Sequence, residues 1–301
     1  MRIVTFRGGF IGDTLFAFPI LKVLREKYSG SHFTLVSNPA VLPLAQAWGL
    51  ADEVCDMSQY PWIELYQDEG IISANWRNLL QRTDLAISLM RNGSEPLKRN
   101  LLEAGAREVI IAHEEQNPRP LKHIMECLAH SIGLQEISAH HIPPITSSDK
   151  VFRPFNPPVV IHPGSSEELR CWPAESFAYV INQLLRLRQP VLLLAGPLDA
   201  KQLRDVRRHV IPSPQPGLFT VLRNAPILEV AQNIQQCKCY LGNDSGMTHL
   251  AALLGVPTIV VTHLAALVHI HPLGPAVEIM AVERLERLSA KKVFETVHKY
   301  I

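Results

Sequence analysis

Gly242-Asn243-Asp244-Ser245-Gly246-Met247-Thr248-His249 joins two runs of apolar residues near the end of this chain. Residues 239–241 precede it, residues 250–254 follow it, and a second short apolar run comes at 258–261. This order predicts a strand, a loop, a helix and another strand. The polar residues lie at the start of the helix, where backbone N–H groups are unpaired and the helix dipole is positive. The segment therefore predicts an anion-binding site in an α/β fold.

The same segment also fits a simpler interpretation. Asp244 or Ser245 could cap the helix, because short polar side chains accept hydrogen bonds from the first turn. Gly246 lacks a Cβ, so a bound group could approach the backbone closely. A capped helix would explain the polar residues without any ligand, and the rest of the sequence must decide between the two.

Composition excludes several classes of protein. The chain has 301 residues, which fits two domains of ordinary size, and 47% of them are hydrophobic, which suffices for buried cores. The net charge is +1, so nothing in the overall balance favours a nucleic-acid partner. There is no N-terminal signal peptide and no run of about 18 apolar residues, which leads us to expect a cytoplasmic protein.

The cysteines do not form a disulfide or metal pattern. There are five of them, widely spaced, and an odd number argues against a disulfide framework. Cys237 and Cys239 flank a single lysine, but no second Cys or His pair lies at ligand spacing. We expect both to be buried thiols in a strand.

Short apolar runs alternate with helical patterns along most of the chain. We expect strands at 3–6, 33–36, 53–55, 85–88, 109–112, 159–162, 191–195, 239–241, 258–261 and 277–281. We expect helices at 13–28, 39–48, 73–81, 95–103, 119–132, 174–187, 200–209, 227–235 and 290–300, besides the helix that follows the opening segment. Such alternation predicts parallel sheets covered on both faces.

The alternation stops between residues 142 and 158, a stretch that contains five prolines. We interpret it as a linker between an N-terminal domain, residues 1–150, and a C-terminal domain, residues 151–301. The predicted fold is α/β, with two doubly wound Rossmann-like domains facing each other across a central cleft. In such domains ligands bind beyond the carboxyl ends of the strands, where the polar segments of this chain are predicted to lie.

The first of these polar segments is Phe6-Arg7-Gly8-Gly9-Phe10-Ile11-Gly12-Asp13-Thr14. It is not a dinucleotide-binding motif, because arginine stands where the first glycine is required and no acidic residue ends the second strand. NAD is therefore not expected. Asp13 has two interpretations: a first-turn acid that complements the helix dipole, or a general base that faces the cleft.

A second polar segment follows the predicted strand 159–162. Ser165 and Ser166 could hydrogen-bond phosphate oxygens, and Arg170 could bridge a diphosphate with two parallel hydrogen bonds. Gly196, at the end of another strand, could line the same pocket. The alternative is a polar turn with a solvated arginine. The sequence has no P-loop and no paired acids typical of a metal site, so we expect no metal.

These segments together resemble glycosyltransferase family 9, the family of lipopolysaccharide heptosyltransferases. The resemblance rests on Gly12-Asp13, on residues 162–166 with Arg170 and Trp172-Pro173, and on residues 242–252, and it covers nearly the whole chain in order. It implies the GT-B fold, with the acceptor on the N-terminal domain and the donor on the C-terminal one. It also implies an inverting, metal-independent transfer of heptose from an ADP-activated donor to a lipid A-linked core or related glycan, with no cofactor besides the nucleotide sugar.

The resemblance assigns roles to individual residues. It makes Asp13 the catalytic base. The donor-binding residues that it implies, together with Gly196, are Ser165, Ser166, Arg170, Asp244, Ser245, Gly246, Met247 and His249. The acceptor side is matched less closely, and its candidates are Gly12, Thr14, Arg91, Arg99, Arg119 and Lys122. The basic members of that set could bind an anionic glycolipid, with peripheral contact at the inner membrane, or could form a solvated face.

One departure concerns the loop after the strand 258–261. Family members often have Phe-Gly where this chain has Thr262-His263, and His269 and His271 follow. The donor sugar and the role of these histidines are therefore open. The alternatives are an enzyme of the same fold acting on another nucleotide sugar, such as an epimerase or a hydrolase, and a nucleotide-sugar binding protein without catalysis.

Overall fold

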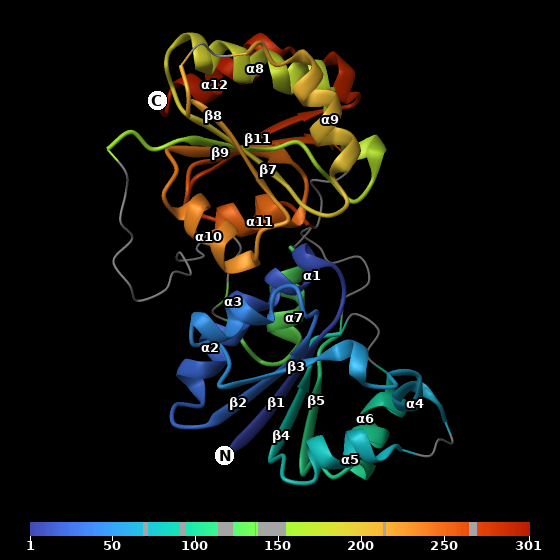
Figure 1. Cartoon of the computed structure of the whole chain (residues 1–301). Helices are drawn as coiled ribbons and strands as arrows, with labels where there is room; N and C mark the ends of the chain where they lie inside the picture. The colour runs from blue at the N-terminus through green and yellow to red at the C-terminus, as the bar shows by residue number, and fades with distance from the viewer. Residues whose placement is uncertain are drawn as a thin grey trace. The chain divides into compact units, whose positions relative to one another are not determined.

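The computed structural model describes residues 1–68, 72–90, 94–113, 123–135, 137, 155–212, 215–264 and 270–301. Contacts divide the chain into two units, Met1–Ala139 and His140–Ile301, and each unit is built on a parallel β-sheet (Figure 1). The predicted fold class, two doubly wound α/β domains, is confirmed. Most of the predicted linker, residues 142–158, lies outside the described residues.

The first unit has five parallel strands in the order β3-β2-β1-β4-β5. They are β1 (Arg2–Arg7), β2 (His32–Ser37), β3 (Glu53–Asp56), β4 (Leu85–Ser88) and β5 (Glu108–Ile111). The helices are α1 (Ile11–Leu15), α2 (Ala17–Lys27), α3 (Leu42–Ala47), α4 (Ile63–Tyr66), α5 (Ala74–Leu80), α6 (Glu95–Glu103) and α7 (Ile124–Ser131), with the 3₁₀ turn η1 (Met57–Gln59). Helices α2 and α3 lie on one face of the sheet, and α4, α5 and α6 on the other (Figure 1).

The second unit has six parallel strands in the order β11-β10-β9-β6-β7-β8. They are β6 (Val159–His162), β7 (Val191–Ala195), β8 (Phe219–Arg223), β9 (Cys239–Asn243), β10 (Thr258–His263) and β11 (Val277–Val282). The helices are α8 (Ala174–Arg186), α9 (Ala200–His209), α10 (Ile227–Gln235), α11 (Gly246–Leu253) and α12 (Ala290–His298), with 3₁₀ turns η2 (Glu168–Arg170) and η4 (Leu285–Arg287).

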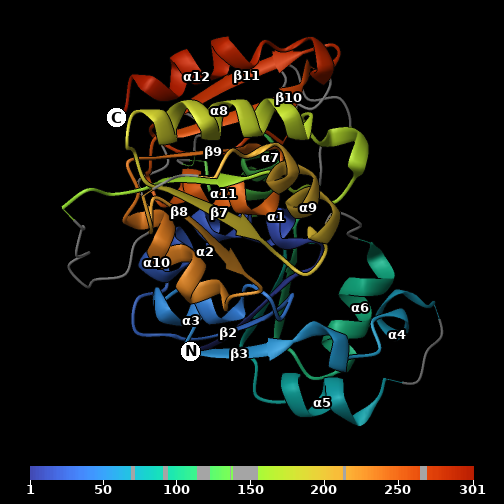
Figure 2. The same ribbon diagram turned by 45° about the horizontal axis from the view of Figure 1, so that its top comes forward.

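Strand order decides where a ligand can bind in the second unit. From β6 the chain adds β7 and β8 on one side, and from β9 it adds β10 and β11 on the other. The two central strands β6 and β9 thus form a topological switch point, at whose carboxyl ends the loops diverge and leave room for a ligand. Helices α8, α9 and α12 cover one face of this sheet and α10 and α11 the other (Figures 1 and 2).

The structure differs from the predicted elements at several places, of which the helix expected at 13–28 and strand β8 are two. The helix expected at 13–28 begins at Ile11 and breaks at Phe16, because Pro19 has no N–H and its ring crowds the carbonyl of Leu15. Strand β8 was not predicted. It is an edge strand whose residues are only half-buried or exposed, so it lacks the continuous apolar run of a central strand.

The cysteine prediction was correct in part. Cys237 and Cys239 are buried and form no disulfide, but only Cys239 lies in β9, whereas Cys237 precedes the strand. Burial raises the pKa of Cys239 to about 12. In the part of the chain that the structure describes, no helix has the length and apolar character needed to cross a membrane.

Trp76 on α5 organises the core of the first unit. It is fully buried, and its ring meets Phe6 of β1 and Trp62 edge to face, with centroids 6.0 and 4.9 Å away. Its indole N–H donates to the carbonyl of Pro61 at 3.2 Å. One side chain thus joins a helix, the central strand and the loop after β3.

We expect Trp76→Ala to lower the free energy of unfolding of the first unit by about 3–5 kcal/mol, the usual cost of a large cavity in a core. Urea unfolding followed by hydrogen exchange of the β1 amides measures this. Leu102→Ala is the control, because Leu102 is 41% exposed and its loss should change stability by less than about 0.5 kcal/mol. Equal losses for the two variants would contradict the role assigned to Trp76.

Candidate functional site

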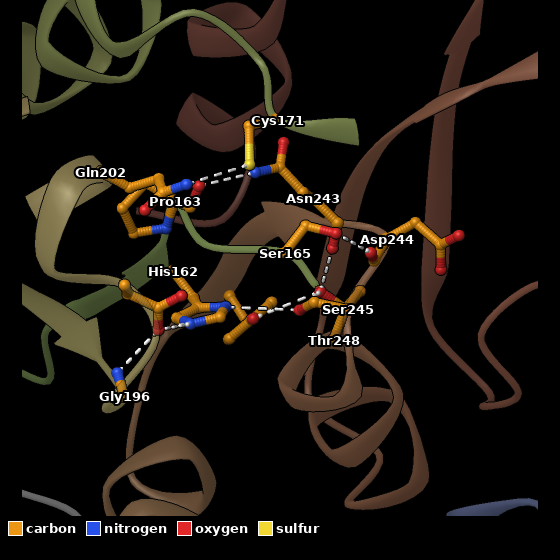
Figure 3. A network of polar contacts seen from close by, with 12 residues as sticks. His162, Pro163, Ser165, Cys171, Gly196, Gln202, Asn243, Asp244, Ser245 and Thr248 are labelled. Atoms are coloured by element: carbon orange, nitrogen blue, oxygen red, sulfur yellow. Dashed lines mark hydrogen bonds and ion pairs between the residues drawn. The ribbon is translucent and has the colours of Figure 1, made fainter. Parts of the chain in front are cut away.

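The start of helix α11 lies at the switch point of the second sheet, directly after β9. Ser245 occupies the N-cap position in extended conformation, but its side chain makes no capping hydrogen bond. Its hydroxyl instead lies 3.3 Å from Nδ1 of His162 and 3.3 Å from Oγ1 of Thr248 (Figure 3). Ser245 therefore occupies the cap position, as the simpler interpretation allowed, but without a side-chain capping hydrogen bond. The N–H groups of the first turn keep the capacity to bind an anion.

His162 and Asp199 form a buried pair beside Ser245. His162 ends β6, Asp199 precedes α9, and their exposed fractions are 5% and 7%. Nε2 of His162 lies 2.9 Å from Oδ2 of Asp199, and the backbone N–H of Gly196 donates to the same oxygen at 2.7 Å. Burial opposes ionisation of Asp199, but the hydrogen bond and charge of His162 and the Gly196 N–H outweigh it and lower the pKa of this carboxyl.

Glycine is required where the loop after β6 passes this carboxylate. A Cβ on Gly164 would lie 2.0 Å from Oδ1 of Asp199, far inside any contact distance. The backbone therefore approaches the His162–Asp199 pair as closely as it does because residue 164 has no side chain. This explains the glycine of the Pro163-Gly164 segment in terms of packing.

Asn243 joins the loops that follow β6 and β9. It is fully buried at the end of β9, and its amide donates to the carbonyl of Pro163 at 2.8 Å. Its Oδ1 accepts from the backbone N–H of Trp172 at 2.9 Å. Ser165 adds a further link, because its hydroxyl donates to the carbonyl of Asp244 at 3.1 Å (Figure 3). The structure thus brings together two segments that lie about 80 positions apart in the sequence.

Charged groups surround the start of α11. Asp244 is 8% exposed, with Nε2 of His249 3.4 Å from one carboxylate oxygen and Nη1 of Arg170 3.9 Å from the other. The side chain of Arg170 is 41% exposed, and its Nε lies 3.4 Å from a carboxylate oxygen of Glu167. Arg170 is thus held near the start of α11 by weak contacts and retains donors that an anionic group could use.

Most of the predicted donor residues lie together in this region. Ser165 and Arg170 contact the Asp244 segment directly, and Gly196 reaches it through Asp199 and His162. Ser166 is exposed on the same loop, whereas Gly246 and Met247 form the first turn of α11 and are half-buried.

In the first unit, Asp13 lies in the first turn of α1 with its side chain 29% exposed. Oδ2 accepts the N–H of Phe10 at 3.1 Å, and Oδ1 lies 3.9 Å from Nη2 of Arg7. Arg7 is 2% exposed and its Nε donates to the carbonyl of Asp13 at 2.9 Å. A Cβ on Gly9, whose φ is +115°, would lie 2.6 Å from that of Asp13. The carboxylate is therefore fixed in place and open to solvent on one side.

The predicted acceptor residues are placed less closely together. Gly12 is half-buried in α1, whereas Thr14 is fully buried and accepts a hydrogen bond from Ser37 at 3.4 Å. Arg99 on α6 donates to the carbonyls of Gln67 and Asp68. Arg91, Arg119 and Lys122 lie outside the described residues, as does His269. His263 ends β10, and no group of three or more His, Cys, Asp or Glu among the described residues could hold a metal.

Sequence reasoning missed Asp199, and it did not single out His162, Asn243 or Thr248 from the motifs that contain them. Asp199 could have been suspected from its place, since it follows Gly196 by three residues just beyond a predicted strand. Its partner His162 is 37 residues away, and only the adjacency of β6 and β7 brings the two together.

Two units, each built on a parallel sheet covered by helices, are the architecture of the GT-B fold. Residues 120–300 match the sequence profile of glycosyltransferase family 9 (heptosyltransferase). This is more than half of the chain, and the protein belongs to that family and is a glycosyltransferase. No curated protein sequence matches the chain.

Solved structures agree over the full length. ADP-heptose LPS heptosyltransferase II of E. coli is similar with a TM-score of 0.78 and 16% identity, over 100% of this chain and 98% of that one. E. coli heptosyltransferase WaaC with ADP is similar with a TM-score of 0.73 and 16% identity, over 100% of both chains. A family 9 glycosyl transferase from Veillonella parvula has a TM-score of 0.73 and 17% identity, over 99% of this chain and 96% of that one. At these identities the similarity establishes the fold.

We expect Asp199→Asn to lower the free energy of unfolding by about 1–3 kcal/mol at pH 7, because a buried histidine loses its charged partner. The folded-state pKa of Asp199 is lowered, so its contribution is complete above the unfolded value of about 4 and is lost as pH falls through the folded value. The difference between wild type and variant should therefore shrink below about pH 4. Urea unfolding at pH 7 and pH 3 measures it.

Asp205→Asn is the matched control. Asp205 pairs with Arg208 one turn away at 3.2 Å, and the side chain of Arg208 is exposed while that of Asp205 is half-buried. Its loss should cost at most about 0.5 kcal/mol at either pH. A cost of Asp199→Asn that is the same at pH 7 and pH 3 would show that the Asp199 charge does not stabilise the fold.

Proposed function

We propose that this protein transfers a heptose from an ADP-activated donor to a lipid A-linked lipopolysaccharide core or a related glycan. The proposal rests on membership of family 9 and on one observation: the uncapped start of α11, held among Ser165, Arg170 and Asp244. E. coli heptosyltransferase WaaC was solved with ADP and with ADP-2-deoxy-2-fluoro heptose. This chain would use the same kind of donor.

The donor diphosphate would bind at the start of α11. The N–H groups of Gly246 and Met247 and the hydroxyls of Ser165 and Ser166 are donors for phosphate oxygens, and the Arg170 guanidinium supplies charge. His249 would act through Asp244, whose position it helps to fix. The buried contacts of His162 and Asn243 already hold these loops in place. The hydrogen-bond donors on the loops therefore need little rearrangement when the diphosphate gains charge in the reaction.

Asp13 would be the general base. It takes the proton of the acceptor hydroxyl as that oxygen attacks the anomeric carbon from the face opposite the nucleotide. A new C–O bond forms while the bond to the diphosphate oxygen breaks, and the nucleotide diphosphate leaves with the electron pair. One such displacement inverts the anomeric carbon, and no metal ion takes part in it.

The acceptor would be an anionic glycolipid held by the first unit. Gly12, next to Asp13 in α1, and Arg99, on α6, would contact it. Arg91, Arg119 and Lys122 are further basic candidates for the same role. Thr14, which is buried, would support the Asp13 turn through Ser37. A lipid-linked acceptor implies a cytoplasmic enzyme with peripheral contact at the inner membrane.

Asp13→Asn should cut turnover by roughly two to four orders of magnitude, the usual range for loss of a general base. The variant is informative because the asparagine oxygen can still accept the Phe10 N–H, so the local structure should survive. Heptose transfer is measured by mass spectrometry of the acceptor, and ADP affinity by calorimetry. ADP affinity should stay at the wild-type value.

Glu26→Gln, an exposed change on α2, is the control and should leave turnover unaltered. Near-normal turnover in Asp13→Asn would remove Asp13 from the role of base. Loss of ADP binding in the same variant would mean that its effect is not confined to the chemical step.

Arg170→Ala should weaken ADP binding by about tenfold or more, because charge-assisted hydrogen bonds to phosphate are lost. The measurement is a calorimetric titration of both proteins with ADP, UDP, GDP and NAD, first with EDTA and then with magnesium. We expect wild type to bind ADP in preference to the others and equally well in both conditions.

Other outcomes would change the proposal in defined ways. Preference for UDP or GDP would keep the enzyme class and change the donor, whereas binding only with magnesium would contradict metal independence. Unchanged ADP affinity in Arg170→Ala would contradict the role of Arg170 in binding the donor diphosphate. Turnover of ADP-heptose without any acceptor would favour a hydrolase or an epimerase.

A further inference from the structure

Helix α9 and the edge strand β8 enclose a hollow of about 410 Å³ in the second unit. Its lining consists of four arginines and two small or apolar side chains: Arg204, Arg207, Arg208, Arg223, Ala200 and Leu203. All four arginines are exposed, whereas Leu203 is buried and anchors α9 to the core. The hollow therefore brings four exposed arginine side chains together beside an apolar residue of the core.

The helix places three of these arginines on one side. Ala200, Leu203, Arg204, Arg207 and Arg208 follow the spacing i, i+3, i+4, i+7 and i+8, which forms a single stripe along a helix. Arg223 is the last residue of β8 and adds the fourth guanidinium from the sheet. Among the described residues β8 pairs with β7 alone, so Arg223 lies on an edge strand of the sheet.

The positive charge of the hollow is largely uncompensated. Arg208 lies 3.2 Å from a carboxylate oxygen of Asp205, but Asp205 is not among the lining residues. Within the described ranges, Arg204, Arg207 and Arg223 form no ion pair, and no carboxylate lines the hollow. Like charges gathered in one concavity repel each other, and a bound anion would relieve that repulsion.

We propose that this arginine hollow binds phosphate groups. Guanidinium groups are planar and donate paired hydrogen bonds, which match the oxygens of a phosphate better than a lysine ammonium does. Several of them on an open surface suit a ligand with more than one phosphate charge. The ligand is either a soluble polyphosphate-type anion or the phosphate headgroups of a lipid surface, and both present the same chemistry.

This site is distinct from the start of α11, where the donor diphosphate is proposed to bind. That start follows β9, whereas β8 lies two strands from β6, roughly 10 Å across the sheet. Gly196 is the donor candidate nearest the hollow, because Arg223 pairs with Ala195 on the neighbouring strand. Arg204, Arg207 and Arg208 lie further along α9, away from its start at Asp199. The inference does not depend on which nucleotide sugar the enzyme uses.

The test compares wild type with Arg204→Gln/Arg207→Gln, a pair of exposed changes that should leave the fold intact. Tripolyphosphate is titrated by calorimetry at low salt, in the presence of saturating ADP so that the donor site is occupied. Sedimentation with vesicles of phosphatidylglycerol, and of phosphatidylcholine as the uncharged reference, tests the lipid source. Lys291→Gln/Lys292→Gln removes two exposed charges from α12 and is the matched control.

We expect the arginine variant to weaken binding by about tenfold or more in at least one arm, and the lysine control to change it much less. Tripolyphosphate binding identifies a soluble ligand, and binding only to phosphatidylglycerol vesicles identifies a lipid surface. Absence of wild-type binding in both arms, or equal loss in the two variants, overturns the proposal. ADP affinity should be the same in all three proteins, so that failure of this site is distinguishable from failure of the donor site.

Discussion

The contact between His162 and Asp199 holds the donor side of this protein in shape. Both groups are almost completely buried, so each must find a polar partner within the protein or lose stability. Their pairing joins the end of β6 to the loop after β7, and the second ring nitrogen of His162 extends the connection to Ser245 after β9. Three adjacent strands are therefore linked at one edge, and the close passage of Gly164 follows from the same pair.

This linkage has a consequence for helix α11. A serine at an N-cap normally satisfies a backbone N–H of the first turn, but the Ser245 hydroxyl contacts His162 and Thr248 instead. The fold thus leaves polar donors at the helix start while Asn243 and Ser165 fix the loops around them. Hydrogen-bond donors held in this way by buried contacts can stabilise developing charge without first having to reorient.

How much of this could be read from the sequence depends on the range of the interaction. Most strands and helices were predictable because apolar periodicity and glycine or proline boundaries are local signals. The exposed edge strand β8 and the break before Pro19 escaped because solvent exposure and ring sterics weaken or override that pattern. The motifs of the donor region were found, but the pairing of His162 with Asp199 was not, since strand order decides it.

The arginine hollow could not be predicted from composition either, because the overall charge does not show which residues the fold brings together. A net charge of +1 describes a chain whose opposite charges nearly cancel, yet four arginines gather beside β8, and no carboxylate is among the described residues that line the hollow. The two anion sites argued for here would also behave differently in salt. Buried dipoles at the start of α11 are weakly screened, whereas guanidinium groups on an open surface lose much of their attraction beyond about 8 Å at physiological ionic strength. A ligand of the hollow must therefore make direct contact with the arginines, which favours phosphate groups over diffuse negative charge.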